Sequence, residues 1–503
     1  MPPARNAARR LPVEMALHRV STARHRLPPV FGTGQLVILG LGVMIGAGIF
    51  SLSGIQAATN AGPAVIVSFV IAALVCFLAA LSYAELSSTI PVAGSVYTFS
   101  YVVFGELWGW LVGWALVLEL LVAAALVSRA WSAYALATLD GFGVEVPAFV
   151  AERGQFDSGL NLIAPAVLVI LTLLVVTGTK LSARVLTIAV LAKVAVILLV
   201  IGVGSRYVDT ANYTPFVPKQ QAAESQGTVL QRLLGDAGGT FGIFGVFAAA
   251  SVITFAYIGF DLIATAAEDT RDPRRSVPRA MLIGLGLVAV LYVAMATVLV
   301  GLRPYTDLGT GAPVSDAMAA AGVGWAASVV NLGGLLAFTT VIMVVLIGQS
   351  RVLFAMGRDG LLPRGLGQVS RTFAAPSRAG AVAGLAAILL AFYPSIGSLE
   401  QMLVLGALFA FFFCAIGVLV LRRREPDLER GFYAPAVPAV PILGALATIW
   451  LGLNLTTDTW RNFGIWMAVG LFFYLVYGRG HSTLAHGHDD AHEPTHARGR
   501  HSR

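Results

Sequence analysis

GLGVMIGAGIFSLSG, residues 40–54, is the stretch that decides the fold. It lies in an apolar run long enough to cross a bilayer, yet five of its fifteen residues are glycine. Glycine weakens a helix interior by about 1 kcal/mol relative to alanine, so a helix that only had to span would use other residues. One interpretation is close helix packing through Gly42 and Gly46. The other is a break at 46–48 whose freed N–H groups point at an anion. The stretch alone leaves both open.

The composition indicates a polytopic membrane protein. Of its 503 residues, 57% are hydrophobic and 12% are charged, whereas a soluble domain carries roughly 25% charge. The only cysteines, Cys76 and Cys414, both lie in apolar runs, which supports neither a disulfide framework nor a metal site. No signal-peptide pattern precedes the first apolar run. The net charge of +7 is therefore interpreted through membrane topology and not through nucleic-acid binding.

Twelve apolar runs predict twelve transmembrane helices. They cover approximately residues 33–58, 62–86, 106–135, 160–178, 182–203, 240–267, 278–301, 325–355, 379–393, 399–421, 437–456 and 460–477. With both ends of the chain in the cytoplasm, the inside segments hold 25 Lys and Arg residues and the outside loops hold 6. This asymmetry predicts a multi-pass protein of the cell membrane, of a bacterial inner membrane by its Arg and Ala usage, with both termini cytoplasmic.

The two ends of the chain are polar. The arm before the first span has six Arg and one Glu, and we expect it to be mostly disordered with room for an interfacial segment. The tail beyond residue 480 holds six of the eight histidines. His486 and His488 allow weak metal binding, but a disordered tail is the simpler interpretation, so no metal or cofactor is predicted.

Charge is costly inside a membrane span, and three charged residues within predicted spans are interpreted here. Glu119 is interpreted as a pocket acid or as a buried structural hydrogen-bonding group, and Arg129 as a side chain that reaches toward the outer face. Lys193 lies near the middle of the fifth span and is one of only three lysines. It is either a structural partner of Glu119 or a group that takes up and releases a proton; the second interpretation is preferred.

A second glycine-marked break occurs five helices after the first. Gly259 interrupts an aromatic stretch of the sixth span, and Asp261 follows it. Corresponding breaks in two halves point to an inverted-repeat transporter with a binding site at the midplane.

This pattern sets the expected domain organisation. We expect an arm (1–32), a first repeat (33–203), a second repeat (240–421), two further helices (437–477) and the tail (480–503).

Seven segments resemble the amino acid–polyamine–organocation superfamily, and within it the cationic amino acid transporter family. They are GVMIGAGIF at 42–50, SYAELSSTIPVAGSVYTF at 82–99, VLELLVAAALVSRAWS at 117–132, FAYIGFDLIATAAEDTRDPRRSVPRA at 255–280, GQSRVLFAMGRDGLLP at 348–363, FYAPAVPAVPILG at 432–444 and YLVYGRGHS at 474–482. The resemblance implies an all-α, LeuT-like fold, in which a five-plus-five inverted repeat is followed by two extra helices.

The resemblance also implies a substrate site. Its residues would be Ile45, Gly46, Ala47, Gly48, Phe255, Ala256, Ile258 and Val345. The amides of 46–48 would meet a substrate carboxylate, carbonyls around Phe255 would meet its ammonium, and the Phe255 ring would close the site as a gate.

The same resemblance gives Lys193 the position that a sodium ion takes in sodium-coupled relatives. Its ammonium would bridge carbonyls of the first helix and hydroxyls of the eighth, Thr339 or Thr340. For those threonines, bonding back to their own helix is the alternative.

These features predict a proton-coupled importer of L-amino acids. Leu120 stands where many family members have an aromatic residue, and Glu119 is a single acid for a cationic side chain, so small or medium neutral amino acids are favoured and cationic ones come second. The expected partners are the amino acid, the proton and the lipid bilayer, and a small accessory membrane subunit is left open. The alternatives are an exchanger or uniporter and a non-transporting sensor. No P-loop, GxSxG or HExxH pattern supports an enzyme or an ATP-driven pump.

Overall fold

The computed structural model describes the residues that carry the fold. These are residues 9–14, 32–92, 94–144, 146–147, 150, 161–178, 183–222, 227–236, 238–267, 270–370, 372–373, 375–392 and 397–484. The remainder of the arm and residues 485–503 of the tail, with His486 and His488, lie outside the described residues.

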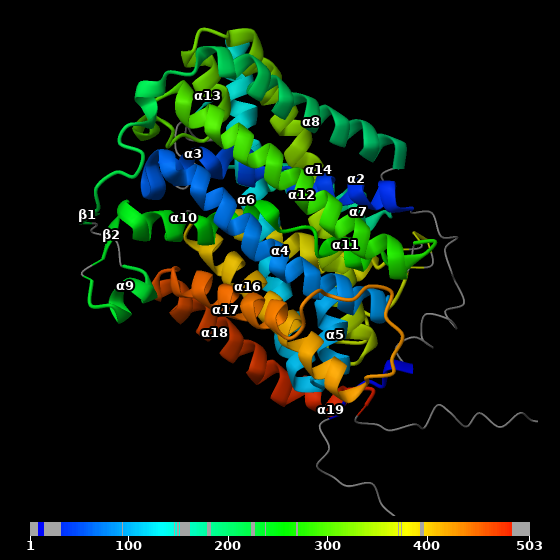
Figure 1. Cartoon of the computed structure of the whole chain (residues 1–503). Coiled ribbons are helices and arrows are strands. Elements are labelled where there is room, and N and C mark those ends of the chain that lie inside the picture. The colour runs from blue at the N-terminus through cyan, green and yellow to red at the C-terminus, as the bar shows by residue number, and fades with distance from the viewer. Residues whose placement is uncertain are drawn as a thin grey trace, which may run out of the picture.

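The first half of the chain is helical except for a short loop region at its end. Its elements are α2 (Thr33–Met44), the π-helix η1 (Gly48–Leu52), α3 (Ser53–Gln56), η2 (Ala57–Ala61), η3 (Gly62–Ala64), α4 (Val65–Thr89), α5 (Ser95–Val103), α6 (Glu106–Gly141), α7 (Ile163–Val176), α8 (Ala183–Gly204), η4 (Ser205–Tyr207) and η5 (Thr210–Tyr213). A small antiparallel pair, β1 (Gln221–Ala222) and β2 (Gly239–Thr240), flanks α9 (Val229–Leu233), and the three lie together at one edge of the molecule (Figure 1).

The second half repeats the helical character. Its elements are α10 (Gly242–Tyr257), α11 (Leu262–Thr265), α12 (Pro273–Leu302), η7 (Tyr305–Asp307), α13 (Pro313–Ala320), α14 (Gly324–Arg358), α15 (Ser377–Ala391), α16 (Gly397–Arg424), α17 (Ala439–Leu453), α18 (Thr457–Phe473), η8 (Tyr474–Gly478) and α19 (Arg479–His481). The expected class, a helical polytopic membrane protein, is therefore confirmed.

Within the part of the chain that the structure describes, eight helical stretches are long and apolar enough to cross a membrane. In one of them, Gly48–Thr89, the second part of the first predicted span runs into the second span. Four further apolar helices, α2, α7, α15 and α17, occupy predicted spans but are shorter than a full crossing. The count of twelve spans and the five-plus-five symmetry stay predictions.

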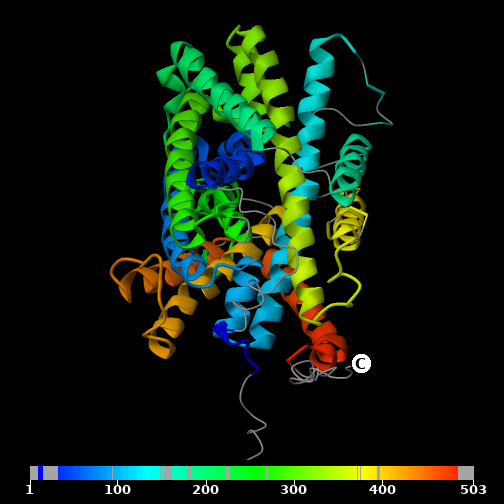
Figure 2. The same cartoon turned by 90° about the vertical axis from the view of Figure 1, so that its right-hand side faces the viewer.

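The helices pack as two groups. α4 packs against α12 and α10, and α12 packs against α2; we call these helices, with α11, the bundle group. α6 packs along α14, and α7 packs along α15 (Figure 2). We call these four helices the scaffold group. α16 contacts both α6 and α4 and so lies on the border of the two groups.

One helix was not expected. It is α5, which lies between the second and third predicted spans and has all of its residues buried. Gly94 has φ +109°, a left-handed conformation that lets the chain turn sharply into α5.

Arg129 lies differently from the sequence expectation, and part of the charged N-terminal arm is packed on the protein. Arg129 is 3% exposed, so its side chain lies inside the protein and does not reach outward. In the N-terminal arm, Leu11 is 3% exposed, and the amide of Glu106 donates to the carbonyl of Arg9 at 2.8 Å. The arm is thus docked over residues 9–14, because a buried leucine and a backbone hydrogen bond hold it against α6.

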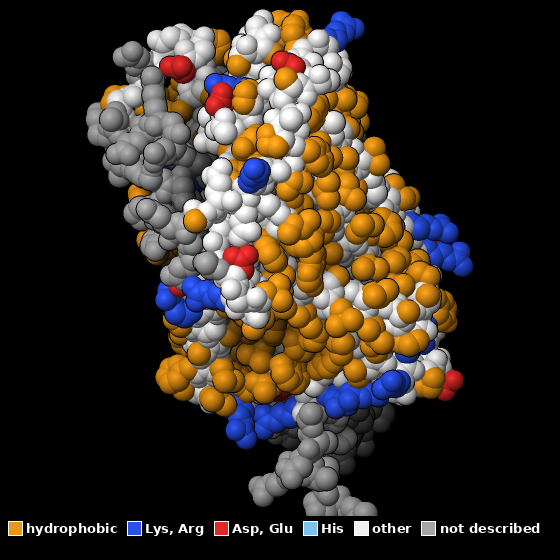
Figure 3. Space-filling view, turned by 60° about the vertical axis from the view of Figure 1, so that its left-hand side comes forward, with side chains coloured by type: hydrophobic (Ala, Val, Ile, Leu, Met, Phe, Trp, Pro, Cys, Tyr) orange, Lys and Arg blue, Asp and Glu red, His pale blue; other side chains and the backbone are white. Residues whose placement is uncertain are grey.

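The outer surface suits a bilayer. A broad apolar band covers one face, and Lys and Arg side chains gather along its lower edge (Figure 3). Large apolar side chains such as Leu74, Ile188 and Leu389 are 62%, 62% and 64% exposed. Such exposure indicates contact with lipid because water would disfavour it.

Candidate functional site

The first broken helix is the structural start of the site. α2 ends at Met44, and Ile45 is extended, with φ −75° and ψ 96°. The helix restarts as η1 at Gly48, and the carbonyl of Gly46 accepts from the amides of Ile49 at 3.3 Å and Phe50 at 3.2 Å. The first amides of a helical segment have no acceptor in a preceding turn, so N–H groups are available here. The break lies at Ile45 and Gly46, at the start of the predicted 46–48 segment.

The second broken helix lies beside the first. α10 ends at Tyr257, Ile258 is extended with ψ 136°, and α11 starts at Leu262. Gly259 has φ +124°, which only glycine adopts readily, and its amide donates to Oδ1 of Asp261 at 3.0 Å. A Cβ at position 259 would lie 2.6 Å from Cγ1 of Val43, so the second break packs directly on the end of α2.

Glycine at the first break also serves packing. A Cβ at position 48 would lie 2.3 Å from the Cα of Ala256, and one at position 46 would lie 2.9 Å from Cγ2 of Val341. The glycine-rich stretch is therefore both broken and closely packed, because the broken backbone and the close approach of α10 and α14 use the same residues.

Buried side chains take up the carbonyls at the end of α2. The ammonium Nζ of Lys193, on α8, donates to the carbonyl of Gly42 at 2.7 Å and to that of Ile45 at 3.1 Å. The hydroxyl of Tyr292, on α12, donates to the carbonyl of Met44 at 2.6 Å. Lys193 has no exposed surface. A helix end leaves its last carbonyls without intrahelical donors, and these two side chains satisfy three of them at membrane depth.

A small cavity lies between the two breaks and the scaffold. It measures about 20 Å³, which holds roughly one water. Its lining residues are Val43, Met44, Gly46, Ala47, Gly48, Glu119, Leu120, Ala123, Val127, Phe255, Ile258, Leu262, Val341 and Val345. An amino acid is several times larger than a water, so the described conformation is closed around this position.

Glu119 is the acid of this cavity. Its side chain comes from α6, and the residue is 1% exposed. Neither carboxylate oxygen has a hydrogen-bond partner in the described structure. A buried carboxyl group without hydrogen-bond donors costs free energy, so Glu119 is a candidate to bind a ligand that supplies a donor. It is not paired with Lys193, whose hydrogen bonds go to α2.

The structure brings together most of the residues expected at the site and leaves others behind it. Six of the eight expected substrate residues line the cavity: Gly46, Ala47, Gly48, Phe255, Ile258 and Val345. Ile45, Ala256 and Lys193 do not line it but lie directly behind, since the carbonyl of Ile45 accepts from Lys193 and Ala256 packs on Gly48.

The two threonines of α14 donate hydrogen bonds back to their own helix, which was the alternative to a contact with Lys193. Thr339 donates to the carbonyl of Leu335 at 2.7 Å and accepts from the indole of Trp131 at 2.9 Å. Thr340 donates to the carbonyl of Ala337 at 2.9 Å. The recorded hydrogen bonds of Lys193 do not include them, so a bridge from the lysine to α14 is not formed in this conformation.

Two contributors were not found from the sequence. Tyr292 is one of many aromatic residues in apolar runs, and nothing local marks its bond to Met44. Val341 lies one helical turn before Val345 on α14, so the i, i+4 spacing could have placed it on the same face.

Comparison with known proteins agrees with this architecture. The family model described as amino acid permease matches residues 31–475. The chain is 39% identical to the methylthioribose transporter of Bacillus subtilis (strain 168) over 452 residues, which are 90% of this chain and 93% of that protein.

Other relatives carry amino acid names. The branched-chain amino acid permease BcaP of the same organism is 39% identical over 459 residues, 90% of this chain and 94% of that protein. Cationic amino acid transporter 2, vacuolar, of Arabidopsis thaliana is 36% identical over 407 residues, 80% of this chain and 61% of that protein. Since the family model covers most of the chain and both bacterial relatives match nearly end to end, the chain belongs to the amino acid permease family of the amino acid–polyamine–organocation superfamily.

Proposed function

We propose that this permease is a secondary active transporter that imports L-amino acids together with protons. The observation that carries the proposal is the meeting of two broken helices at Gly48 and Ala256, with the ammonium of Lys193 on the carbonyls at the end of α2. Transport would proceed by alternating access, with the bundle and scaffold groups opening the cavity to either side in turn.

The two breaks suit a zwitterion. The amide end of η1, with Gly46, Ala47 and Gly48 on the cavity wall, carries the positive end of a helix dipole and attracts a carboxylate. The extended backbone at Ile258 ends α10 at the same cavity, where the carbonyl ends of a helix attract an ammonium. The ring of Phe255 also lines the cavity and is 8% exposed, so its displacement would open the site as a gate.

The walls favour a modest, neutral side chain. Leu120, Ala123, Val127, Val341 and Val345 all line the cavity, and all are apolar. In a hydrophobic pocket, one substrate methylene changes the free energy of discrimination between substrates by roughly 1–3 kcal/mol. Small or medium neutral amino acids are therefore the first substrate class of the proposal. The name of the relative BcaP refers to branched-chain amino acids, which belong to this class.

Proton coupling is assigned to Lys193. When charged, its ammonium holds the carbonyls of Gly42 and Ile45 and ties α8 to the end of α2. Loss of the proton removes one charge from these contacts and weakens them, because hydrogen bonds from charged groups are roughly twice as strong as neutral ones. The proton gradient could then bias the position of α2 relative to α8.

The unpartnered carboxylate of Glu119 supports a second substrate class. A ligand with donors on its side chain would satisfy the two oxygens that the protein leaves without partners. A cationic amino acid supplies such donors. The hydroxyl groups of a sugar would supply them as well, and one relative is named for methylthioribose.

A thermal-shift screen of the purified protein against the twenty L-amino acids and methylthioribose, at two pH values, tests the proposal first. A ligand that binds only the folded state stabilises it by about 2.7 kcal/mol at a hundredfold excess over Kd, and this raises the melting temperature. Stabilisation by alanine or by branched neutral residues supports the first class, and stabilisation by lysine and arginine alone supports the second. A response to methylthioribose and to no amino acid overturns the amino acid assignment.

Liposomes loaded with the stabilising ligand then separate symport from exchange. A proton-coupled symporter accumulates substrate in response to an inward proton gradient. Counterflow without any proton movement would instead assign the exchanger or uniporter alternative. A protein that binds its ligand but gives neither signal would be the non-transporting sensor.

A further inference from the structure

A strap of chain joins α16 to α17 and crosses the bundle group. It comprises residues 425–438, and we refer to it as the strap. Glu429 on the strap and Arg274 on α12 form an ion pair at 2.6 Å. A Cβ at Gly431 would lie 2.4 Å from the carbonyl oxygen of Arg274, so the strap backbone lies against the first turn of α12.

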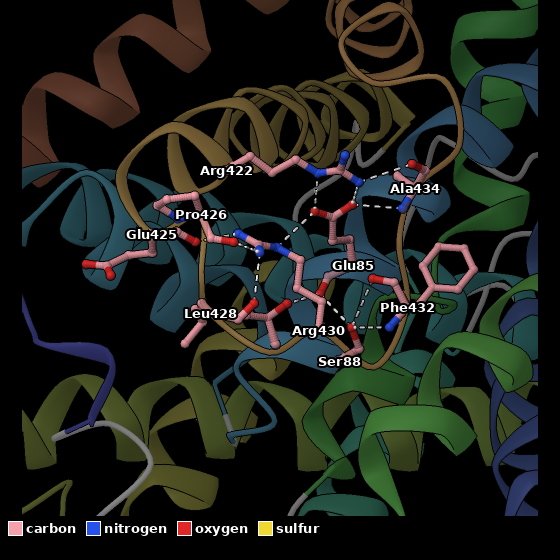
Figure 4. A network of polar contacts seen from close by, with 10 residues as sticks. Glu85, Ser88, Arg422, Glu425, Pro426, Leu428, Arg430, Phe432 and Ala434 are labelled. Atoms are coloured by element: carbon pink, nitrogen blue, oxygen red, sulfur yellow. Dashed lines mark hydrogen bonds and ion pairs between the residues drawn. The ribbon is translucent and has the colours of Figure 1, made fainter.

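Glu85, near the end of α4, fastens the strap (Figure 4). Its Oε1 accepts from Nε of Arg422 at 2.7 Å, and its Oε2 accepts from Nη2 of Arg422 at 2.7 Å. Its Oε2 also accepts the backbone amide of Ala434, on the strap, at 2.8 Å. Such a two-point carboxylate–guanidinium contact is specific in geometry as well as strong. One carboxylate thereby joins α4, the end of α16 and the strap.

Two further contacts complete this cluster. We call the cluster the latch; its residues are Glu85, Ser88, Arg422, Arg430, Phe432 and Ala434. Nε of Arg430, on the strap, lies 3.5 Å from Oε1 of Glu85, while its other nitrogens donate to the carbonyls of Glu425 at 2.8 Å and Leu428 at 2.8 Å. The hydroxyl of Ser88, one turn after Glu85, accepts the amide of Phe432 at 3.0 Å. Figure 4 shows these groups converging on the end of α4.

The position of the latch determines to which group of helices α16 is attached. α16 packs on α6 of the scaffold group and on α4 of the bundle group, so packing alone leaves it between the two. The latch ties the basic end of α16 to α4 through Glu85, and the strap that it holds meets α12 at Arg274. α4 and α12 belong to the bundle group.

Burial indicates that the latch does not open in each cycle. The side chains of Glu85 and Arg430 are 2% and 3% exposed. Separation of Glu85 from its partners would leave buried charges without partners, which is strongly unfavourable.

We propose that the Glu85 latch stays closed throughout the transport cycle and makes the basic end of α16 move with α4 and α12. The inference rests on the proposed alternating-access function. Glu85 is then a positioning residue: it touches no substrate, but it transmits the movement of the bundle group to the helix that borders the scaffold. This role is separate from the cavity, since Glu85 is not among its lining residues.

The first test compares binding with turnover in Glu85→Gln. The full chain is reconstituted in liposomes, and counterflow of the stabilising amino acid is measured. We expect turnover to fall at least tenfold while the ligand-induced thermal shift stays within twofold of wild type in apparent affinity. Arg423→Gln, which removes an exposed charge from the neighbouring position of α16, is the matched control and should keep wild-type turnover. Full turnover in Glu85→Gln overturns the latch.

The second test replaces the latch covalently. In a C76A/C414A background, S88C and F432C are joined by a short thiol-specific bifunctional reagent, since Oγ of Ser88 lies 3.0 Å from the amide of Phe432. With Glu85 intact, the cross-linked protein should transport at the uncross-linked rate; arrest would show that the latch must open and would overturn the proposal. With Glu85→Gln, cross-linking should restore turnover, a rescue that lost stability at another place would not give.

The two proposals fail in different ways. Wild-type protein that shows no counterflow of any ligand overturns the proposed function. Wild-type protein that is active, beside a Glu85→Gln variant that is equally active, overturns only the latch.

Discussion

Gly48 and Ala256 come so close that no side chain fits between them: a Cβ at position 48 would lie 2.3 Å from both the Cα and the Cβ of Ala256. Gly48 opens the helical segment after the first break, and Ala256 lies in the last turn of α10 before the second. This contact therefore fixes the distance between the two breaks. A side chain at position 48 would displace Ala256, so the shape of the cavity, which Gly48 lines, depends on this glycine.

Gly48→Ala should separate the two breaks. Overpacking of this kind costs typically 1–3 kcal/mol, so we expect a lower melting temperature and loss of the ligand-induced thermal shift. Gly286→Ala, within α12, is the control because no atom beyond the neighbouring backbone of its own helix lies within 4 Å of the added carbon, and alanine there should stabilise the helix by about 0.5–1 kcal/mol. Wild-type ligand binding in Gly48→Ala would show that the contact is dispensable.

Lys193→Ala should abolish accumulation driven by a pH gradient while leaving counterflow measurable. The ammonium that holds the carbonyls of Gly42 and Ile45 would be gone, and with it the group assigned to the proton. Tyr292→Phe is matched to it, because it removes the neighbouring bond to Met44 at the same helix end and leaves the lysine in place. Tyr292→Phe should keep its pH dependence. Full uptake with unchanged pH dependence in Lys193→Ala would end the coupling assignment.

Glu119→Gln should separate substrate classes. The change keeps the shape of the side chain and removes its charge, so binding of lysine and arginine should weaken at least tenfold, whereas binding of alanine and leucine should change less than threefold. Thermal shifts over a concentration series give both values. Since neither carboxylate oxygen has a partner within the described structure, the substitution breaks no recorded hydrogen bond. An equal loss for neutral and cationic ligands would place Glu119 in binding of the substrate backbone or in proton transfer.

Val345→Ala should enlarge the cavity and favour longer side chains. Val345 lines the cavity and is 3% exposed, so two methyl groups are removed from the wall. One methylene in a hydrophobic pocket is worth about 1–3 kcal/mol, so preference should move tenfold or more toward larger neutral amino acids. Val344→Ala is the adjacent control, since Val344 does not line the cavity. Competition for uptake among alanine, leucine and phenylalanine measures the change; an unaltered order would place the side-chain pocket elsewhere.

Glu106→Gln should loosen the C-terminal segment. Both oxygens of this buried carboxylate hold that segment, with Oε1 accepting from the hydroxyl of Tyr474 at 3.0 Å and Oε2 from that of Ser482 at 2.5 Å. Hydrogen bonds to charged groups contribute about 1.5–3 kcal/mol each. Limited trypsin digestion at Arg479 should therefore become faster than in wild type. Glu429→Gln, an exposed acid, should leave it unchanged; equal digestion of all three proteins would contradict a role for Glu106 in docking the tail.

Much of the backbone could be predicted from the sequence because its causes are local. Long apolar runs place the helices, since a chain in lipid must satisfy its own backbone groups. Clustered glycine at 40–54 and Gly259 predict two breaks, and the structure has them at Ile45–Gly46 and at Ile258–Gly259. Burial of Glu119 and Lys193 also follows from charge inside an apolar run.

The pairings between distant residues were decided by the tertiary structure. The sequence predicts that Lys193 is buried, but it does not predict whether the ammonium reaches Gly42 and Ile45 or Glu119. Lys193 lies 151 residues from Gly42 and 148 residues from Ile45 along the chain, and the packing of α8 on α2 brings them together. The latch between Glu85 and Arg422 spans 337 residues, and no local pattern distinguishes that arginine from its neighbours at 423 and 424. Local composition determines where a membrane helix forms and breaks; which partner each buried polar group finds depends on three-dimensional packing, because that partner can come from any helix.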